Sequence, residues 1–155
     1  MKKSFLTAII TVFAILLLAA CGQGQGQGEE TKKLLMGTSA DFPPFETRDN
    51  KGEIVGFDID LAKYIANELG YELEIQDMNF DGLVGALQAN RVDFVASGMS
   101  ATDTRKESVD FSEEYHRSGE MFVTLKDSEL KGMADLEGKH IAVQLGTIQE
   151  EGAKK

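Results

Sequence analysis

Beyond the first thirty residues, the pattern of apolar and polar positions predicts strands and helices in alternation. Short apolar or alternating runs are typical of buried strands, and they lie at 33–38, 71–76 and 92–96. Apolar residues at helical spacing lie between these runs, at 58–69 and 81–89. This order predicts a mostly parallel sheet in an α/β layer.

The ends of the two helices are also marked in the sequence. We expect Asp58 and Asp81 to begin them as N-caps, and Gly70 to end the first one. The apolar residues expected on the buried faces of these helices are Ile59, Ala62, Ile65, Ala66 and Leu69 in the first, and Leu83, Val84 and Leu87 in the second.

A second unit is predicted after residue 126. A strand at 119–125 is expected just before this unit. Within the unit we expect a short helix at 133–138, a strand at 139–144 and a last helix from Gly146 onward. The part after residue 126 therefore has one strand and two helical pieces, which cannot bury both faces of a sheet by themselves.

Ligands of parallel α/β sheets collect beyond the carboxyl ends of the strands. The loops at those places are 39–45, 79–82 and 97–102, and each carries an aromatic ring or exposed backbone amides. Both prolines of the chain stiffen the first loop. We expect Phe45 of that loop in the core and Phe42 at the site.

Arg105 follows the third loop in the first turn of a predicted helix, which Thr102 and Asp103 begin. Loop amides, a helix N-terminus and an arginine together predict an anion site for a carboxylate or phosphate. The alternative, which spacing leaves open, is that Arg105 pairs with a surface acid such as Glu107 or Asp110.

Composition narrows the possible partners. The chain has 155 residues, 42% of them hydrophobic and 27% charged, which is enough apolar content for a packed core. Its net charge of -10 argues against nucleic acid as a partner and against binding to an anionic membrane through the folded surface. We expect no cofactor, no metal and no catalytic residue.

The first thirty residues predict export and anchoring. Two lysines precede an apolar run at 5–20, which is short for a membrane span. The run ends in Leu-Ala-Ala before Cys21, the single cysteine, and this resembles a bacterial lipobox with Cys21 as the lipidated residue. The alternative is a transmembrane anchor with an incidental cysteine. We therefore predict a signal peptide at 1–20 and a lipidated cysteine with a flexible Gly/Gln tether at 21–32.

Several motifs are similar to those of family-3 solute-binding proteins, the extracytoplasmic receptors of polar amino-acid ABC importers. The motifs are G-F-D-I-D-L-A at 56–62, F-D-G-L-V-G-A-L-Q at 80–88, V-D-F-V-A-S-G-M-S-A-T-D-T-R at 92–105, V-D-F-S at 109–112 and V-Q-L-G-T at 143–147. The resemblance covers residues 33–155 almost without gaps.

The resemblance implies a periplasmic-binding-protein-like type II fold, in which the ligand lies between two lobes. Residues 33–125 would form lobe one with the first hinge strand near 121–125, and 126–155 would begin lobe two. Family members continue beyond the position that matches Lys155, so the resemblance implies a nearly complete lobe one and a truncated lobe two. With half of the contacts gone, we expect weak ligand binding or none.

The resemblance also implies roles at the ligand. Arg105 and the N–H of Ser100 would bind the α-carboxylate of an amino acid. The carbonyl of Gly98 and the hydroxyl of Ser100 would face its α-ammonium group. Phe42 and Phe80 would lie on either side of its side chain.

Further contacts would select the ligand or come from lobe two. Ser39 and Asp41 lie where family members often choose the side chain, and Gln144 and Thr147 would reach across from lobe two. Ile148 departs from the small residue that is usual after that threonine. The acidic residue that completes the ammonium site would match a position beyond the end of the chain.

The implied function is a lipid-anchored, non-catalytic substrate-binding component on the extracytoplasmic face of the bacterial membrane. Its partners would be a free polar L-amino acid, the ABC permease subunits and, through the lipid, the membrane. Alternatives are an enzyme on the same fold, such as a dehydratase, a receptor ligand-binding domain, or a non-functional truncated product. His116 and His140, the two histidines, are expected at the surface and so do not favour an enzyme.

Overall fold

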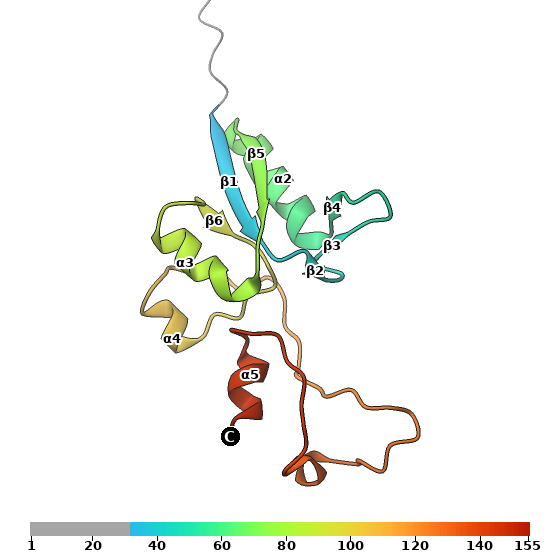
Figure 1. Ribbon diagram of the computed structural model, residues 1–155. Coiled ribbons are helices and arrows are strands. Elements are labelled where there is room, and N and C mark those ends of the chain that lie inside the picture. The colour runs from blue at the N-terminus through green and yellow to red at the C-terminus, as the bar shows by residue number, and fades with distance from the viewer. Residues whose placement is uncertain (1–31) are drawn as a thin grey trace, which may run out of the picture. The chain divides into compact units, whose positions relative to one another are not determined.

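The computed structural model describes residues 32–155 (Figure 1). The predicted signal peptide at 1–20, Cys21 and nearly all of the predicted tether lie outside the described residues. None of the helices in the described part is long and apolar enough to cross a membrane.

The main sheet has three parallel strands in the order β5-β1-β6, which confirms the predicted α/β arrangement (Figure 1). β1 spans Lys33–Thr38, β5 spans Glu72–Asp77 and β6 spans Phe94–Val95. β6 is shorter than the predicted strand at 92–96, because only Met36 and Gly37 of β1 pair with it.

A second, antiparallel sheet holds the stiff loop after β1. It has the order β2-β3-β4, with β2 at Asp41–Phe42, β3 at Glu46–Arg48 and β4 at Ile54–Val55. Backbone pairing of Phe42 with Glu46 folds the proline loop back on itself. The aromatic rings of this loop are therefore held by sheet hydrogen bonds as well as by the prolines.

Helix α2, Phe57–Leu69, covers one face of the parallel sheet. Successive residues of a strand point to opposite faces, and Met36 of β1 packs on this side with Ile59 and Ala62. Ala66 is also buried, as predicted, but Ile65 and Leu69 are 39% and 60% exposed. The predicted burial of Ile65 and Leu69 was wrong, because the face of α2 that is buried is narrower than the apolar face of this helix.

The start of α2 differs from the prediction. Gly56, not Asp58, is the N-cap, and no side chain caps the helix. The N–H groups of Phe57 and Asp58 instead donate to the carbonyls of Pro44 and Phe45, both at 3.0 Å. Because the backbone already satisfies these donors, the Asp58 side chain is free to turn inward. Gly70 ends the helix in the left-handed conformation, as predicted.

Helix α3, Leu83–Gln88, covers the other face. Leu83 and Ala86 are buried here, and the Leu83 side chain reaches Gly37 of β1. The predicted cap by Asp81 was wrong, since Asp81 lies inside a 3₁₀ turn, η1 at Phe80–Gly82, and makes no capping bond. Val84 and Leu87 are only partly buried.

Beyond helix α4, Asp103–Lys106, regular structure is sparse. A 3₁₀ turn, η2 at Met133–Leu136, and helix α5 at Ile148–Ala153 agree with the predicted helices. The predicted strands at 119–125 and 139–144 are absent from the described chain. A strand needs a partner for its backbone groups, and neither segment has one in the sheets described.

Gly56 offers a test of how the proline loop meets α2. Its φ is 137°, and a Cβ there would lie 2.2 Å from the Phe45 carbonyl oxygen. We expect Gly56→Ala to lower the free energy of unfolding by more than about 2 kcal/mol in urea titrations. Gly85→Ala is the matched control, because nothing lies within 4 Å of its added Cβ. It should stabilise α3 by up to about 1 kcal/mol, and equal losses in both variants would contradict this account.

Candidate functional site

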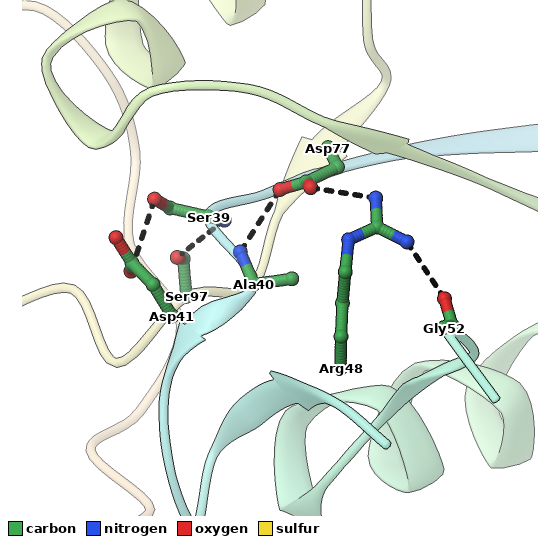
Figure 2. Close-up of polar contacts among 7 residues, drawn as sticks. All are labelled: Ser39, Ala40, Asp41, Arg48, Gly52, Asp77 and Ser97. Atoms are coloured by element: carbon green, nitrogen blue, oxygen red, sulfur yellow. Dashed lines mark hydrogen bonds and ion pairs between the residues drawn. The ribbon is translucent and has the colours of Figure 1, made fainter. Parts of the chain in front are cut away.

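The three loops at the carboxyl ends of the parallel strands meet at one edge of the sheet. The Ser39 N–H, after β1, donates to the Ser97 hydroxyl, after β6, at 3.0 Å. The Ala40 N–H donates to Asp77 at the end of β5, at 2.9 Å (Figure 2). Direct hydrogen bonds therefore join the predicted loops 39–45 and 97–102 and tie the first of them to the end of β5, just before the predicted loop 79–82.

An open hollow of about 280 Å³ lies at this edge. It is lined by Ser39, Ala40, Asp41, Asp77, Met78 and Asn79. Figure 2 shows Asp77 bound to the Arg48 guanidinium, at 2.8 Å, so that its charge is compensated. Asp41 accepts from two neutral donors, Ser39 Oγ at 3.2 Å and Gln144 Nε2 at 3.1 Å. Asp41 thus brings a carboxylate to the hollow without an ion-pair partner in residues 32–155.

Arg105 lies at the start of α4, as predicted, and Thr102 caps this helix by accepting from the Arg105 N–H. The guanidinium donates to the carbonyls of Ser100, at 2.7 Å, and Gly146, at 2.9 Å. It also lies 5.5 Å from the centre of the Phe80 ring.

The contacts of Arg105 are to neutral groups. The pairing with Glu107 or Asp110, left open by the sequence, is not among the ion pairs of the described chain. Partial burial lowers the pKa of Arg105, and the negative charge of Glu151 acts in the opposite direction. The side chain stays protonated all the same, so it presents a positive charge that an anion can compensate.

Phe42 packs between the first and third loops, against Phe45 and Gly98. Its ring is 48% exposed and stacks on Phe45, with ring centres 5.4 Å apart. Phe45 is only partly buried and is not among the buried core residues, where the sequence placed it. Gly98 has a φ of 52°, and a Cβ there would lie 2.9 Å from the Phe42 ring. A glycine is therefore required for this close approach.

Residues 144–147 lie against the loop cluster. Gln144 reaches Asp41, and the Gly146 carbonyl reaches Arg105. The Thr147 hydroxyl donates to the Gln144 carbonyl at 2.7 Å and accepts from the Glu150 N–H at the start of α5. Thr147 therefore shapes this segment through its side chain, whereas Gln144 extends its amide to the cluster.

Sequence reasoning missed a buried polar cluster beneath these loops. Glu46 and Asp58 are both 0% exposed, and Ser97 is 1% exposed. Ser97 Oγ donates to Glu46 at 2.8 Å, while the Gly98 N–H and the Tyr115 hydroxyl donate to Asp58 at 2.8 and 2.9 Å. The available signal was two acids placed within apolar segments, P-F-E and G-F-D-I.

Burial dominates the electrostatics of this cluster. Burial is the main reason that the pKa of Glu46 is raised to about 8. The hydrogen bond from Ser97 lowers this pKa, whereas the negative charges of Asp58 and Asp41 raise it further. Burial and the Asp58 charge also raise the pKa of the Tyr115 hydroxyl. Both groups are thus neutral near pH 7.

The histidines lie outside this cluster. Both are exposed, as expected, and His116 packs edge-on against Phe45 with ring centres 4.9 Å apart. Within residues 32–155, no group of His, Cys, Asp and Glu side chains is arranged to hold a metal ion.

The family model of the bacterial extracellular solute-binding proteins, family 3, matches residues 34–153. The chain belongs to this family. The arginine-binding extracellular protein ArtP of Bacillus subtilis (strain 168) is 46% identical over 154 residues, which cover 99% of this chain and 60% of that protein. This member of the family thus spans about 60% of the length of that curated relative.

Two solved structures from T. maritima agree with this family-3 fold. Holo ArgBP is 50% identical with a TM-score of 0.76, over 79% of this chain and 55% of that one. The arginine-bound form of domain 1 of the same protein is 57% identical with a TM-score of 0.53, over 54% of this chain and 66% of that one. The predicted fold class is confirmed, and none of the three names describes an enzyme. The boundary between the lobes at residue 125 stays a prediction.

Proposed function

We propose that this family-3 member binds a free polar amino acid with a cationic side chain and delivers it to an ABC importer. The observation that carries the proposal is a pair of opposite charges at one loop cluster. Arg105 and Asp41 both lack an ion-pair partner in the described chain, and the three-residue segment 144–146 contacts both of them. A zwitterion with a cationic side chain complements this arrangement.

The α-carboxylate would bind Arg105, whose fork of donors matches it, together with the Ser100 N–H. Ser100 and Gly98 would receive the α-ammonium group through the hydroxyl and the carbonyl. Phe42 and Phe80 would contact the side chain, and an aromatic face also attracts a cation.

Asp41 would bind the cationic end of the ligand. The Ser39 hydroxyl, which bonds to one Asp41 oxygen at 3.2 Å, orients the carboxylate. Two relatives support this choice of ligand, since ArtP is an arginine-binding protein and domain 1 of the T. maritima protein is described in an arginine-bound form. A carboxylate at this position favours arginine or lysine over glutamine by the gain of a charged hydrogen bond.

We also propose that residues 33–125 are lobe one and that 126–155 begin lobe two. Gln144 and Gly146 of that segment already contact Asp41 and Arg105, so a ligand would share or displace them. Thr147 would act by holding this turn, since its hydroxyl is engaged locally.

Lobe one alone is proposed to suffice for measurable binding. The sequence led us to expect very weak binding or none, because lobe closure supplies contacts and excludes water. The relative's domain 1, however, is described as arginine-bound, and it matches 54% of this chain. This favours a site in which the loops of lobe one bind arginine before the two lobes close on each other.

We propose that the chain works on the extracytoplasmic face of the membrane, held by lipid on Cys21 and facing the permease subunits of the importer. The Leu-Ala-Ala-Cys sequence and the Gly/Gln tether support this.

Replacement of Arg105 tests the ligand site directly. We expect Arg105→Ala to weaken arginine binding by about 2–5 kcal/mol, since the ligand carboxylate would lose its charged partner. Arg91→Ala is the control, because Arg91 is exposed and precedes β6 at the far end from the loops. Calorimetric titration should show native affinity for the control, and equal losses in the two variants would rule out the role of Arg105.

The anchor has its own test. Mass spectrometry of the native membrane fraction should find a mature N-terminus at Cys21 with a diacylglyceryl group on its sulfur. Replacing Cys21 with Ser should release the chain from the membrane fraction. Native protein that keeps an unmodified Met1 would defeat the proposal.

A further inference from the structure

Two buried carboxyl groups support the ligand loops. Glu46 comes from β3 and Asp58 from α2, and both are 0% exposed. The two carboxyl groups are held by adjacent residues, because the Ser97 hydroxyl donates to Glu46 at 2.8 Å and the Gly98 N–H donates to Asp58 at 2.8 Å. Two ionised carboxylates in such a place repel each other and lose hydration, so the stable arrangement has one proton between them.

The hydrogen bonds indicate which group carries this proton. Asp58 accepts from the Gly98 N–H at 2.8 Å and from the Tyr115 hydroxyl at 2.9 and 3.0 Å, and such donors favour a carboxylate. Glu46 accepts one bond, from Ser97, and its buried Oε2 has no partner. A proton on Oε2 would turn this oxygen into a donor, for which the neighbouring Asp58 carboxylate would be the acceptor. Burial, which raises the pKa of Glu46 to about 8, agrees with this assignment.

Both halves of the pair contact the ligand loops directly. The Ser97 hydroxyl that donates to Glu46 also accepts the Ser39 N–H at 3.0 Å. Asp58 holds the N–H of Gly98, the residue on which the Phe42 ring packs.

We propose that Glu46 and Asp58 form a one-proton pair that positions the ligand loops, so that losing the proton weakens amino-acid binding. Glu46 acts through Ser97 and is a positioning residue, not a ligand contact. Ionisation of Glu46 would place a second negative charge beside Asp58, and one carboxylate would have to move or admit water. Either movement pulls on Ser97 or Gly98 and so changes the loops. The expected loss of amino-acid binding rests on the proposed function, whereas the expected protonation of the two acids does not.

Other charged and titratable groups face the pair from each neighbouring element. Asp41 lies on β2, and its charge also disfavours ionisation of Glu46. Tyr115 donates to Asp58, and His116 packs on Phe45, the residue before Glu46. Arg48, on the same strand as Glu46, is bound to Asp77. No cation pairs with either carboxyl among the ion pairs of residues 32–155.

The pH dependence of stability has a definite sign. The pKa of Glu46 is raised from 4.5 to about 8 in the folded chain, so the folded state holds a proton that the unfolded state releases. The stability contributed by this proton is complete below pH 4.5 and is lost as the pH rises to about 8.

The experiment compares the full chain with Glu46→Gln, whose amide keeps a donor for Asp58 and an acceptor for Ser97 but cannot ionise. Glu68→Gln, an exposed acid on α2, is the matched control, and His116→Gln removes the contribution of the nearby histidine. Arginine affinity is measured by calorimetry at pH 6 and pH 9, and Tm is measured between pH 4.5 and pH 9.

We expect the wild-type affinity to fall about fivefold more than that of Glu46→Gln between pH 6 and pH 9, if the Glu46 pKa is about one unit higher in the bound chain than in the free chain. Titration of the ligand's own amino group affects both proteins equally and cancels. The Tm of the wild type and of both controls should fall with rising pH relative to Glu46→Gln.

Parallel Tm profiles of wild type and Glu46→Gln would overturn the proton pair. Different Tm profiles with equal affinity ratios would overturn its effect on the loops. If arginine bound at neither pH, the proposed function would fail, and with it the binding consequence, while the Tm profiles would still decide on the proton. If Glu46→Gln failed to fold, carbon NMR titration of the wild-type Glu46 carboxyl would decide: a midpoint well above 4.5 is expected, and an ordinary midpoint overturns the pair.

Discussion

The parallel pairing of β1 with β5 and β6 is the constraint on which the rest of the structure depends. Because the strands run in the same direction, the loops that follow them emerge at one edge. Ser39 follows β1, Asp77 ends β5 and Ser97 follows β6 closely. The N–H groups of Ser39 and its neighbour Ala40 donate to Ser97 and Asp77, so these loops are joined. Residues more than thirty positions apart are in this way brought to one cluster.

The cluster keeps its charges in two separate places. Above the loops, Arg105 and Asp41 are held by neutral groups and remain open to a charged ligand. Beneath them, Glu46 and Asp58 are buried and bound to the loop backbone or to Ser97. If Glu46 and Asp58 share one proton, as proposed, both can support the loops through strong hydrogen bonds. The pair then places only one negative charge below the site.

The sequence predicted the features that depend on local patterns. The strand at 33–38, the cap by Thr102 and the stop at Gly70 follow from hydrophobic periodicity and from the conformational preferences of single residues. The loops of the site were found because their order along the chain follows from the parallel sheet. Arg105 was singled out by the same local pattern, and its contact with Phe80 is a tertiary fact that no spacing reveals.

Features that depend on tertiary partners were not predicted correctly. Asp58 has every local mark of a helix cap, but backbone carbonyls of the proline loop satisfy the helix donors and its side chain turns inward. Segments 119–125 and 139–144 hold short apolar runs typical of strands, yet no neighbouring strand pairs with them in the described chain. Glu46 escaped notice because burial of an acid depends on the surfaces packed around it, which are far apart in the sequence.

Amide NMR spectra of the labelled chain during titration with arginine test most directly whether the loop cluster is an amino-acid site. The account predicts saturable shifts at Asp41, Phe42, Gly98, Ser100 and Arg105, while amides on the exposed face of α2, such as that of Glu68, stay unchanged. Saturable shifts confined to other parts of the chain, or none at millimolar arginine while the chain is folded, would contradict it.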